Sequence, residues 1–264
     1  MWGNNSCEQL GLGSSFRGVD RIFAPTPISP NFDTTEMQWR NLSVRNAVLG
    51  RKFGLAIDKF ERVYSWGDNS HGQLGVGDRN SRNSPVLIEA LQHVRQVSVG
   101  QQHSAAIDSR RQLWTWGDCA DGRLGHGVLF TEIRSVQGNV ISRNRKQVDF
   151  LPEPKLVEFF RLSASGREVS LVACGDRFTV ALDQQGLAWS WGSGIYGQLG
   201  RGSNVMSAPL PGRIAYVPAH GAFSRMSSAH TVAVTDINEE ERGHKSHGGP
   251  KSDRAGTGSE QVHD

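Results

Sequence analysis

Histidines are the first residues of this sequence whose chemistry could serve a metal ion or a proton transfer. The four considered are His71, His103, His126 and His230. None stands in an H-x-H or H-E-x-x-H spacing, which would bring two imidazoles to one ligand-binding face. Related strings of about ten residues recur in this sequence. In two of them His103 and His230 stand at the position where two others have Phe53 and Phe178. A position that accepts either ring is typical of packing, so we interpret these histidines as structural and expect no metal site.

Aspartates recur at one position of a repeated string, at Asp58, Asp108 and Asp183. Carboxylates that share catalysis would break the symmetry of a repeat, and these follow it. An aspartate in a tight turn accepts hydrogen bonds from backbone amides that follow it. We therefore predict that the three are turn formers. Since no serine or cysteine has a distinctive nucleophile setting either, we expect no catalytic residue and no enzyme.

One glycine-rich string, GSGIYG at Gly192 to Gly197, matches the G-x-G-x-x-G pattern of dinucleotide loops. Such a loop needs a following helix, whose N-terminus holds the phosphates. The residues that follow, QLGRGSNVMSAP, do not read as a helix, and the other copies of the string lack the middle glycine. We therefore expect no bound cofactor.

Composition narrows the class of protein further. The chain has 264 residues with a formal net charge of +3, too small to indicate nucleic acid or membrane by itself. Its three cysteines, Cys7, Cys119 and Cys174, are far apart and form no C-x-x-C, which favours a reducing compartment without disulfides or zinc. No signal peptide and no apolar run of membrane-spanning length is visible. We expect an intracellular protein of the cytoplasm or nucleus.

Four copies of one string organise the chain. They read WGNNSCEQLGLG, WGDNSHGQLGVG, WGDCADGRLGHG and WGSGIYGQLGRG. The shared positions are Trp2, Gly3, Leu10, Gly11 and Gly13; Trp66, Gly67, Leu74, Gly75 and Gly77; Trp116, Gly117, Leu124, Gly125 and Gly127; and Trp191, Gly192, Leu199, Gly200 and Gly202. A string that recurs in fixed register is the mark of a repeat architecture, so we interpret these residues as structural.

A second string precedes three of these copies, led by Gly50, Gly100 and Gly175 at sixteen residues before the next Trp. A weaker copy covers 227–235. Each copy predicts a strand with a small residue in one column, at Ala56, Ala106, Ala181 and Ala233, followed by a strand that ends in aromatics. With one or two connector strands, such as Val94 to Val99, each unit has three or four short strands. That pattern is typical of a β-propeller blade.

Together the two strings resemble the regulator of chromosome condensation repeat family of propellers, over about residues 2 to 235. The resemblance implies an all-β propeller, usually of seven blades. With four motif copies, we expect an incomplete or open ring, and a partial sequence is favoured over a closed four-bladed one. The expected division is a domain over 1–235, with units near 2–58, 66–108, 116–183 and 191–235. Residues 236–264 are a polar stretch that we expect to be a disordered tail.

The longest connector, residues 128–150, breaks the repeat and is the main candidate contact element. Its IRSVQGNVIS string, Ile133 to Ser142, predicts a hairpin that turns at Gly138 and Asn139. Just after this string we expect a basic cluster of Arg143, Arg145 and Lys146, which Arg134 joins from nearby. The connector from Ser14 to Trp39, with prolines at 25, 27 and 30, is a second, extended surface candidate.

The resemblance also implies functions. In the founding member of the family, a protruding hairpin wedges into a small GTPase and expels its nucleotide. We expect a non-catalytic interaction propeller for protein partners. The alternative is guanine-nucleotide exchange on a Ras-like GTPase, with or without association with chromatin. Direct chromatin binding is a weaker third class. A light-sensing relative in this family uses Trp in G-W-R-H-T strings. The matching strings here are GRKFG, GQQHS and GDRFT, which have no Trp, so we do not expect light sensing.

Overall fold

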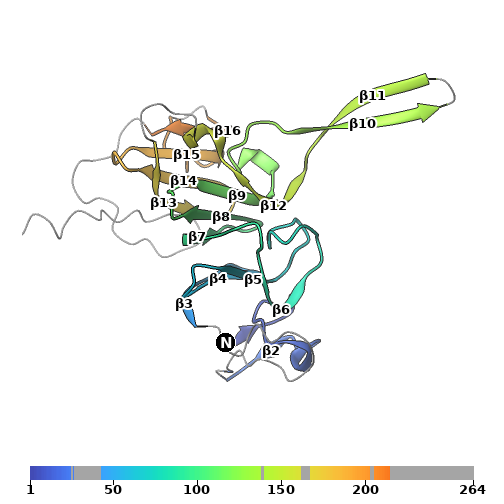
Figure 1. Ribbon diagram of the computed structural model, residues 1–264, viewed down its shortest axis with the longest axis vertical. Helices are drawn as coiled ribbons and strands as arrows, with labels where there is room; N and C mark the ends of the chain where they lie inside the picture. Colours follow the sequence, from blue (N-terminus) through green and yellow to red (C-terminus); the bar gives the residue numbers. More distant parts are fainter. Residues whose placement is uncertain (25, 27–42, 138–139, 162–166, 203–204, 215–264) are drawn as a thin grey trace, which may run out of the picture.

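The computed structural model describes residues 1–24, 26, 43–137, 140–161, 167–202 and 205–214, with the backbone alone for 14 and 132–145. The fourth copy of the strand string (227–235), the polar stretch 236–264 and the prolines of the first connector lie outside these residues. The described chain is almost all β. Three four-stranded antiparallel sheets follow one another along the molecule (Figure 1).

We call these sheets blades 1, 2 and 3. Blade 1 has the order β3-β4-β5-β6, from Val44–Leu49, Phe53–Asp58, Val63–Gly67 and Arg82–Leu87. Blade 2 has the order β7-β8-β9-β12, from Val94–Val99, His103–Asp108, Leu113–Asp118 and Phe150–Leu156. Blade 3 has the order β13-β14-β15-β16, from Val169–Cys174, Phe178–Asp183, Ala188–Ser193 and Ser207–Arg213.

Smaller elements complete the described chain. β1 (Gly3–Asn4) pairs with β2 (Arg21–Ile22) before blade 1. A second, isolated pair, β10 (Phe130–Gln137) and β11 (Val140–Gln147), is inserted between β9 and β12. The short helices are η1 (Ser14–Phe16), η3 (Ala120–Gly122) and α1 (Glu158–Arg161). The connector after Ser14 is therefore not simply extended, because it contains η1 and the paired strand β2.

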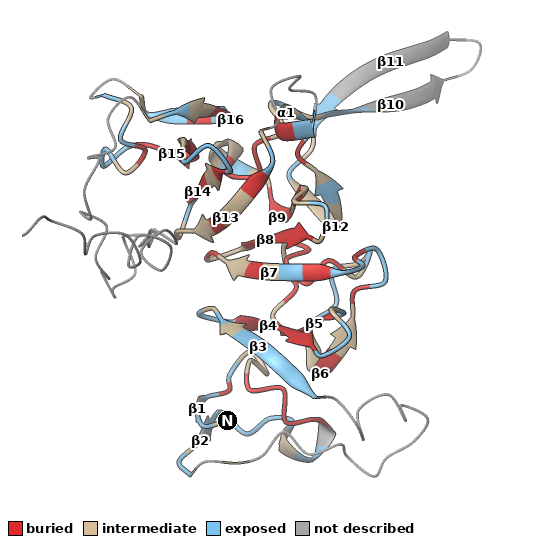
Figure 2. Cartoon of the chain, turned by 60° about the vertical axis from the view of Figure 1, so that its left-hand side comes forward, coloured by how far each residue is buried: buried red, intermediate tan, exposed pale blue. Residues whose placement is uncertain are grey.

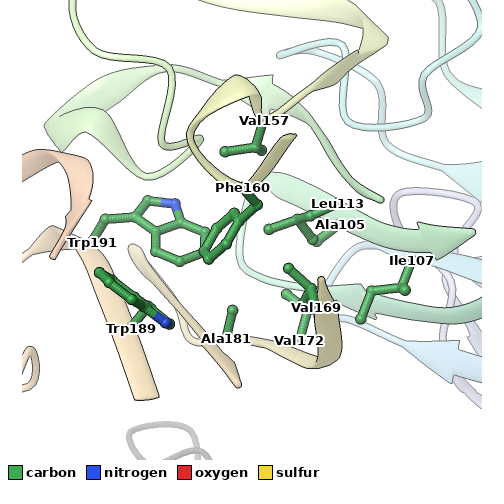
Figure 3. Close-up of a cluster of buried hydrophobic side chains, with 10 residues drawn as sticks. All are labelled: Ala105, Ile107, Leu113, Val157, Phe160, Val169, Val172, Ala181, Trp189 and Trp191. Atoms are coloured by element: carbon green, nitrogen blue, oxygen red, sulfur yellow. The ribbon is translucent and has the colours of Figure 1, made fainter. Parts of the chain in front are cut away.

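The core lies between neighbouring blades. The middle strands β4 and β8 are buried along their whole length, shown in red in Figure 2, while β3 is mostly exposed. The predicted column of small residues faces these contacts: Ala106 belongs to the cluster between blades 1 and 2, and Ala181 to the cluster between blades 2 and 3. Figure 3 shows the second cluster, where Phe160 lies beside Trp191. An alanine there lets the sheets approach without a void, since interiors are close-packed.

The repeated Trp and Leu-Gly positions lock one blade to the next. Nε1 of Trp116 in blade 2 donates a hydrogen bond of 2.9 Å to the carbonyl of Gln73, in the turn that follows β5 of blade 1. The neighbouring Gly75 has φ +74°, and a Cβ there would lie 2.6 Å from Trp116 Nε1. Trp66 and Trp191 meet Gly11 and Gly125 in the same way. A bare glycine is required here by both backbone and space.

Trp66, Trp116 and Trp191 are each at most 2% exposed, whereas Trp2 is 64% exposed. The three aspartates are turn formers, as predicted. Asp108 Oδ1 accepts the backbone N–H of Arg110 and of Gln112, both at 2.9 Å. The equivalent bonds form at Asp58 and Asp183. In blades 2 and 3 the second carboxylate oxygen also accepts an indole N–H, from Trp114 or Trp189.

Candidate protein-interaction site at the inserted hairpin

The hairpin β10–β11 projects away from the stack of blades (Figure 1). Its strands pair antiparallel from Phe130 opposite Gln147 to Gln137 opposite Val140. A hairpin was predicted here, but over the shorter span of Ile133 to Ser142. The ladder extends further because the backbone of the polar residues beyond Ser142 also pairs with β10, which a periodicity based on apolar residues does not reveal.

The longer ladder corrects the placement of the basic residues. Arg143, Arg145 and Lys146 lie within β11, so they belong to a strand of the hairpin and do not follow it. Arg134 lies within β10. Lys146 is exposed, and its Nζ lies 3.7 Å from Asp149 Oδ2. The predicted turn residues Gly138 and Asn139 lie outside the described residues. The ladder on either side of them leaves two residues for the connection.

The base of the hairpin is tied to blade 2 by backbone hydrogen bonds. Val148 donates to the carbonyl of Leu129 at 2.9 Å, and Cys119 donates to the carbonyl of Asp149 at 2.9 Å. The next residue, Phe150, is the register partner of Asp118. The hairpin therefore leaves the blade from a closed ladder and not from a loose loop.

A buried arginine supports this base. Arg123 is 1% exposed, and its Nη1 lies 3.0 Å from Asp118 Oδ2. Its Nη2 lies 3.2 Å from Asp121 Oδ2, and its Nε donates to the carbonyl of Ala120 at 2.9 Å. Arg177 of blade 3 reaches the same Asp121 oxygen at 2.8 Å. We call Arg123, Asp118, Asp121 and Arg177 the arginine cluster, and it joins the hairpin base to the next blade.

Burial sets the electrostatics of this cluster. It lowers the pKa of the Arg123 guanidinium, while the carboxylates of Asp118 and Asp121 act in the opposite direction. A buried cation persists only when it is paired, which two carboxylates do here. Asp121 itself has φ +57°, a left-handed conformation that costs an L residue about 1–2 kcal/mol. The ion pairs to Arg123 and Arg177 hold it there.

His103 contacts blade 3, and burial shifts its pKa and that of His126. His103 has the same register position as Phe178, each opposite a glycine of the next strand, and its Nε2 lies 2.9 Å from Thr179 Oγ1. Burial, then the charge of Arg123, lower the pKa of His103 to about 3. Burial, then Lys155, lower the pKa of His126 to about 4. Both rings are neutral at physiological pH.

Cys119 lies at the base of the hairpin, beside the Asp118 carboxylate. Burial, and then the nearby Asp118 carboxylate, raise the pKa of the Cys119 thiol to about 12. A thiol with so high a pKa holds almost no thiolate, which is the reactive form. Among the described residues no group of three or more His, Cys, Asp or Glu side chains could hold a metal ion. Over those same ranges, no helix is long and apolar enough to cross a membrane.

The sequence reasoning overlooked Arg123. A signal was available, because the copies of the turn have Gln9, Gln73 and Gln198 at this position and only the third copy has arginine. The copy with the arginine is also the one that carries the long connector. A charged residue in place of an amide at one position of a repeat indicates that this copy forms different contacts from the others.

The chain matches family models over most of its length. The model described as the regulator of chromosome condensation (RCC1) repeat matches residues 61–107, 112–182 and 185–234. A second model of the same description matches residues 169–198. The matched ranges contain strands of all three blades.

Several curated proteins are similar to the chain. The ultraviolet-B receptor UVR8 of Arabidopsis thaliana is 28% identical over 236 residues, which cover 89% of this chain and 46% of the receptor. The human E3 ubiquitin-protein ligase HERC2 is 36% identical over 199 residues, 74% of this chain and 4% of the ligase. Human RCC2 is 30% identical over 182 residues, 66% of this chain and 30% of RCC2. The chain thus spans less than half the length of these relatives.

Solved structures agree on the fold. Yeast RCC1 (Prp20), in a structure with Kap60, superposes with a TM-score of 0.58 at 23% identity, covering 83% of this chain and 44% of that chain. Human WBSCR16 superposes with a TM-score of 0.54 at 23% identity, covering 80% and 45%. With its blades, its buried Trp-to-turn contacts and these matches, the chain belongs to the family of regulator of chromosome condensation (RCC1) repeat proteins.

Proposed function

We propose that the chain is a non-catalytic interaction propeller that presents the hairpin β10–β11 to a protein partner. The projection of this hairpin from the blades is the observation that supports the proposal (Figure 1). An isolated two-stranded hairpin is only marginally stable in water. Because this hairpin adds little to the stability of the fold, a role in contacting a partner is favoured. The basic residues of its strands give the ribbon a positive charge, which would steer an acidic partner.

The second candidate is nucleotide exchange on a Ras-like small GTPase. It is favoured by the family, since a solved propeller of Saccharomyces cerevisiae, Prp20p, is described by its binding to Gsp1p and histones. An exchange factor accelerates nucleotide release because it binds the empty GTPase more tightly than the loaded one. Association with chromatin would accompany this role through salt-dependent phosphate contacts.

A capture experiment separates the two candidates. The purified chain is immobilised and exposed to lysate, once with EDTA and once with magnesium and GTP. Partners retained equally under both conditions support the interaction propeller. A small GTPase retained only with EDTA supports exchange. The same capture with a triple variant, Arg143→Glu, Arg145→Glu and Lys146→Glu, tests whether the hairpin is the contact.

A matched triple variant controls for loss of positive charge. Arg51, Lys52 and Arg95 are exposed residues of blades 1 and 2, and their reversal to Glu removes the same charge far from the hairpin. Both triple variants should change the free energy of unfolding by less than about 0.5 kcal/mol, as surface changes usually do. If the hairpin variant captures a partner as well as the control variant does, the proposed contact is contradicted.

A further inference from the structure

The backbone register divides the hairpin into two unequal faces. Residues directly opposite each other in an antiparallel pair share a face, and successive residues of a strand alternate between faces. One face, which we call the arginine face, holds the pairs Phe130–Gln147, Glu132–Arg145, Arg134–Arg143 and Val136–Ile141. The opposite face holds Thr131–Lys146, Ile133–Asn144, Ser135–Ser142 and Gln137–Val140.

The charge is concentrated on the arginine face. It holds three arginines and one glutamate, whereas the opposite face holds the single cation Lys146. The register also places Arg134 directly opposite Arg143. Like charges in that position destabilise a strand pair, so this arrangement is costly to the free hairpin. An anionic group of a partner that binds at this pair of positions would offset the cost.

Exposed apolar residues, which we call the apolar shoulder, lie at the base of the hairpin. Phe130, the first residue of the face, is 56% exposed, and Val128 just before it is 53% exposed. Leu210 of blade 3 is 51% exposed and lies beside Gly127, where its Cδ2 would be 3.6 Å from an added Cβ. The hydrogen bond of 2.8 Å from Gly127 N–H to the carbonyl of Pro209 fixes this neighbourhood. Exposed apolar residues grouped in this way are typical of contact surfaces.

We infer that the arginine face and this shoulder form one docking surface for an acidic, amphipathic protein segment. Carboxylates would meet the arginines, whose planar guanidinium groups bind carboxylates through paired hydrogen bonds. Phe130 and Arg134 are four residues apart on one strand, about 13 Å at the usual rise, so the segment needs apolar and acidic groups at that separation. This inference rests on the proposed function and specifies which face is used and what chemistry it accepts.

Nucleic acid is a poorer fit to the same surface. Binding to a duplex depends on neutralising several phosphates, and three arginines against one glutamate supply a small excess of charge. The exposed Phe130, Val128 and Leu210 would also gain nothing from a phosphate backbone. A protein segment uses both parts of the surface.

One matched pair of variants tests the choice of face. Arg143→Glu and Lys146→Glu change the same strand by the same two charges, on opposite faces. The probes are a fluorescein-labelled peptide of Glu and Leu, and a second peptide in which Ser replaces every Leu. By fluorescence anisotropy, the Glu-Leu peptide should bind the unaltered chain more tightly than the Glu-Ser peptide. Arg143→Glu should weaken that binding about tenfold and Lys146→Glu less than about threefold.

Folding does not obscure the result. Arg143→Glu places opposite charges across the ladder at Arg134, which does not weaken the hairpin. A third variant, Phe130→Ser, should abolish the preference for the Glu-Leu peptide over the Glu-Ser peptide. Equal melting temperatures of all variants would establish that only the surface has changed.

Three results would overturn the inference. They are no binding of the Glu-Leu peptide to the unaltered chain, an equal or larger loss with Lys146→Glu, and tighter binding of a DNA duplex of the same charge. Capture from lysate separates this failure from that of the proposed function. A partner lost only with Lys146→Glu keeps the hairpin as the contact and refutes the face, whereas a partner that survives both variants refutes the hairpin contact itself.

Discussion

The turns at 66–77 and 116–127 have the same length and the same role, but they are stabilised by different chemistry. In the first turn Gln73, fully buried, donates from Nε2 to Asp68 at 3.0 Å and accepts the N–H of His71 at 2.8 Å. In the second turn Arg123 replaces the amide and forms ion pairs with Asp118 and Asp121. In the first turn, the neutral amide of Gln73 forms its hydrogen bonds within the turn. In the second, the Arg123 guanidinium is paired with two carboxylates, one of which also pairs with Arg177 of blade 3.

This difference coincides with the hairpin. The second turn continues into β10–β11 and pairs with its returning end, since Asp118 is opposite Phe150. An ion-paired cluster resists rotation of its members more strongly than one amide does, because it has several charged hydrogen bonds in a dry site. The comparison indicates that the repeat was reinforced at the point where it carries an extra element.

Gly75→Val should produce the largest loss, because both turns depend on the bare glycine against the next Trp. The valine would need φ +74° and would clash with Trp116. We expect more than about 4 kcal/mol of lost unfolding free energy, measured by urea denaturation. Gly197→Val is the matched control, because Gly197 has φ +75° but an added Cβ would meet no non-adjacent residue within 4 Å. It should lower the free energy of unfolding by only about 1–2 kcal/mol. Equal losses would show that the contact with Trp116 has no structural weight.

Asp118→Asn should separate the two turns. The change leaves the buried Arg123 with one carboxylate fewer, and breaking a buried ion pair costs about 3 kcal/mol. Asp68→Asn in the first turn faces the neutral Gln73 and should cost about 1 kcal/mol. Thermal and urea unfolding of both variants provide the measurement. Similar losses in the two turns would contradict the distinction drawn between them.

His103 should make stability depend on pH. Its pKa of about 3 in the folded chain is far below the ordinary value of 6.5, so the unfolded chain binds the proton more tightly. The stability is therefore complete above pH 6.5 and is lost as pH falls from 6.5 toward 3. Between pH 7 and pH 5 this residue should account for about 2 kcal/mol. His103→Phe, the residue that blades 1 and 3 have there, should remove that share of the slope in urea denaturation curves.

Arg123→Gln should have the smallest effect on stability, because Gln is the residue that the other copies of this turn use. We expect about 1 kcal/mol, less than for Asp118→Asn, because the carboxylates left without their cation are 11% and 27% exposed and can be hydrated, whereas Arg123 is 1% exposed. The effect on the hairpin should be larger than the effect on the blade. Amide hydrogen exchange at Val148 and Cys119, whose N–H groups close the base, should become faster. Unchanged exchange at both amides would show that the cluster does not support the hairpin.

Much of the fold could be predicted because the copies of the repeat can be compared with one another. The Trp and Leu-Gly positions recur in register, and strands, aspartate turns and small-residue columns followed from that register. The hairpin was also predictable from the Gly138-Asn139 pair between apolar residues. Its true length was not, because the strand beyond Ser142 is polar and is defined by backbone pairing with β10. The burial of Arg123 could not be predicted either, since arginine is ordinarily a surface residue.

What the sequence determined by itself is the local and periodic part of this protein: the blade unit, its tight turns and its membership of a propeller family. These follow from short-range spacing, which one copy repeats in the next. Only the tertiary structure decided which side chains meet across blades. The pairing of Asp121 with Arg177 and the contact of Gly127 with Leu210 join residues 56 and 83 positions apart. Such contacts depend on how blades stack, and no periodicity along the chain encodes them.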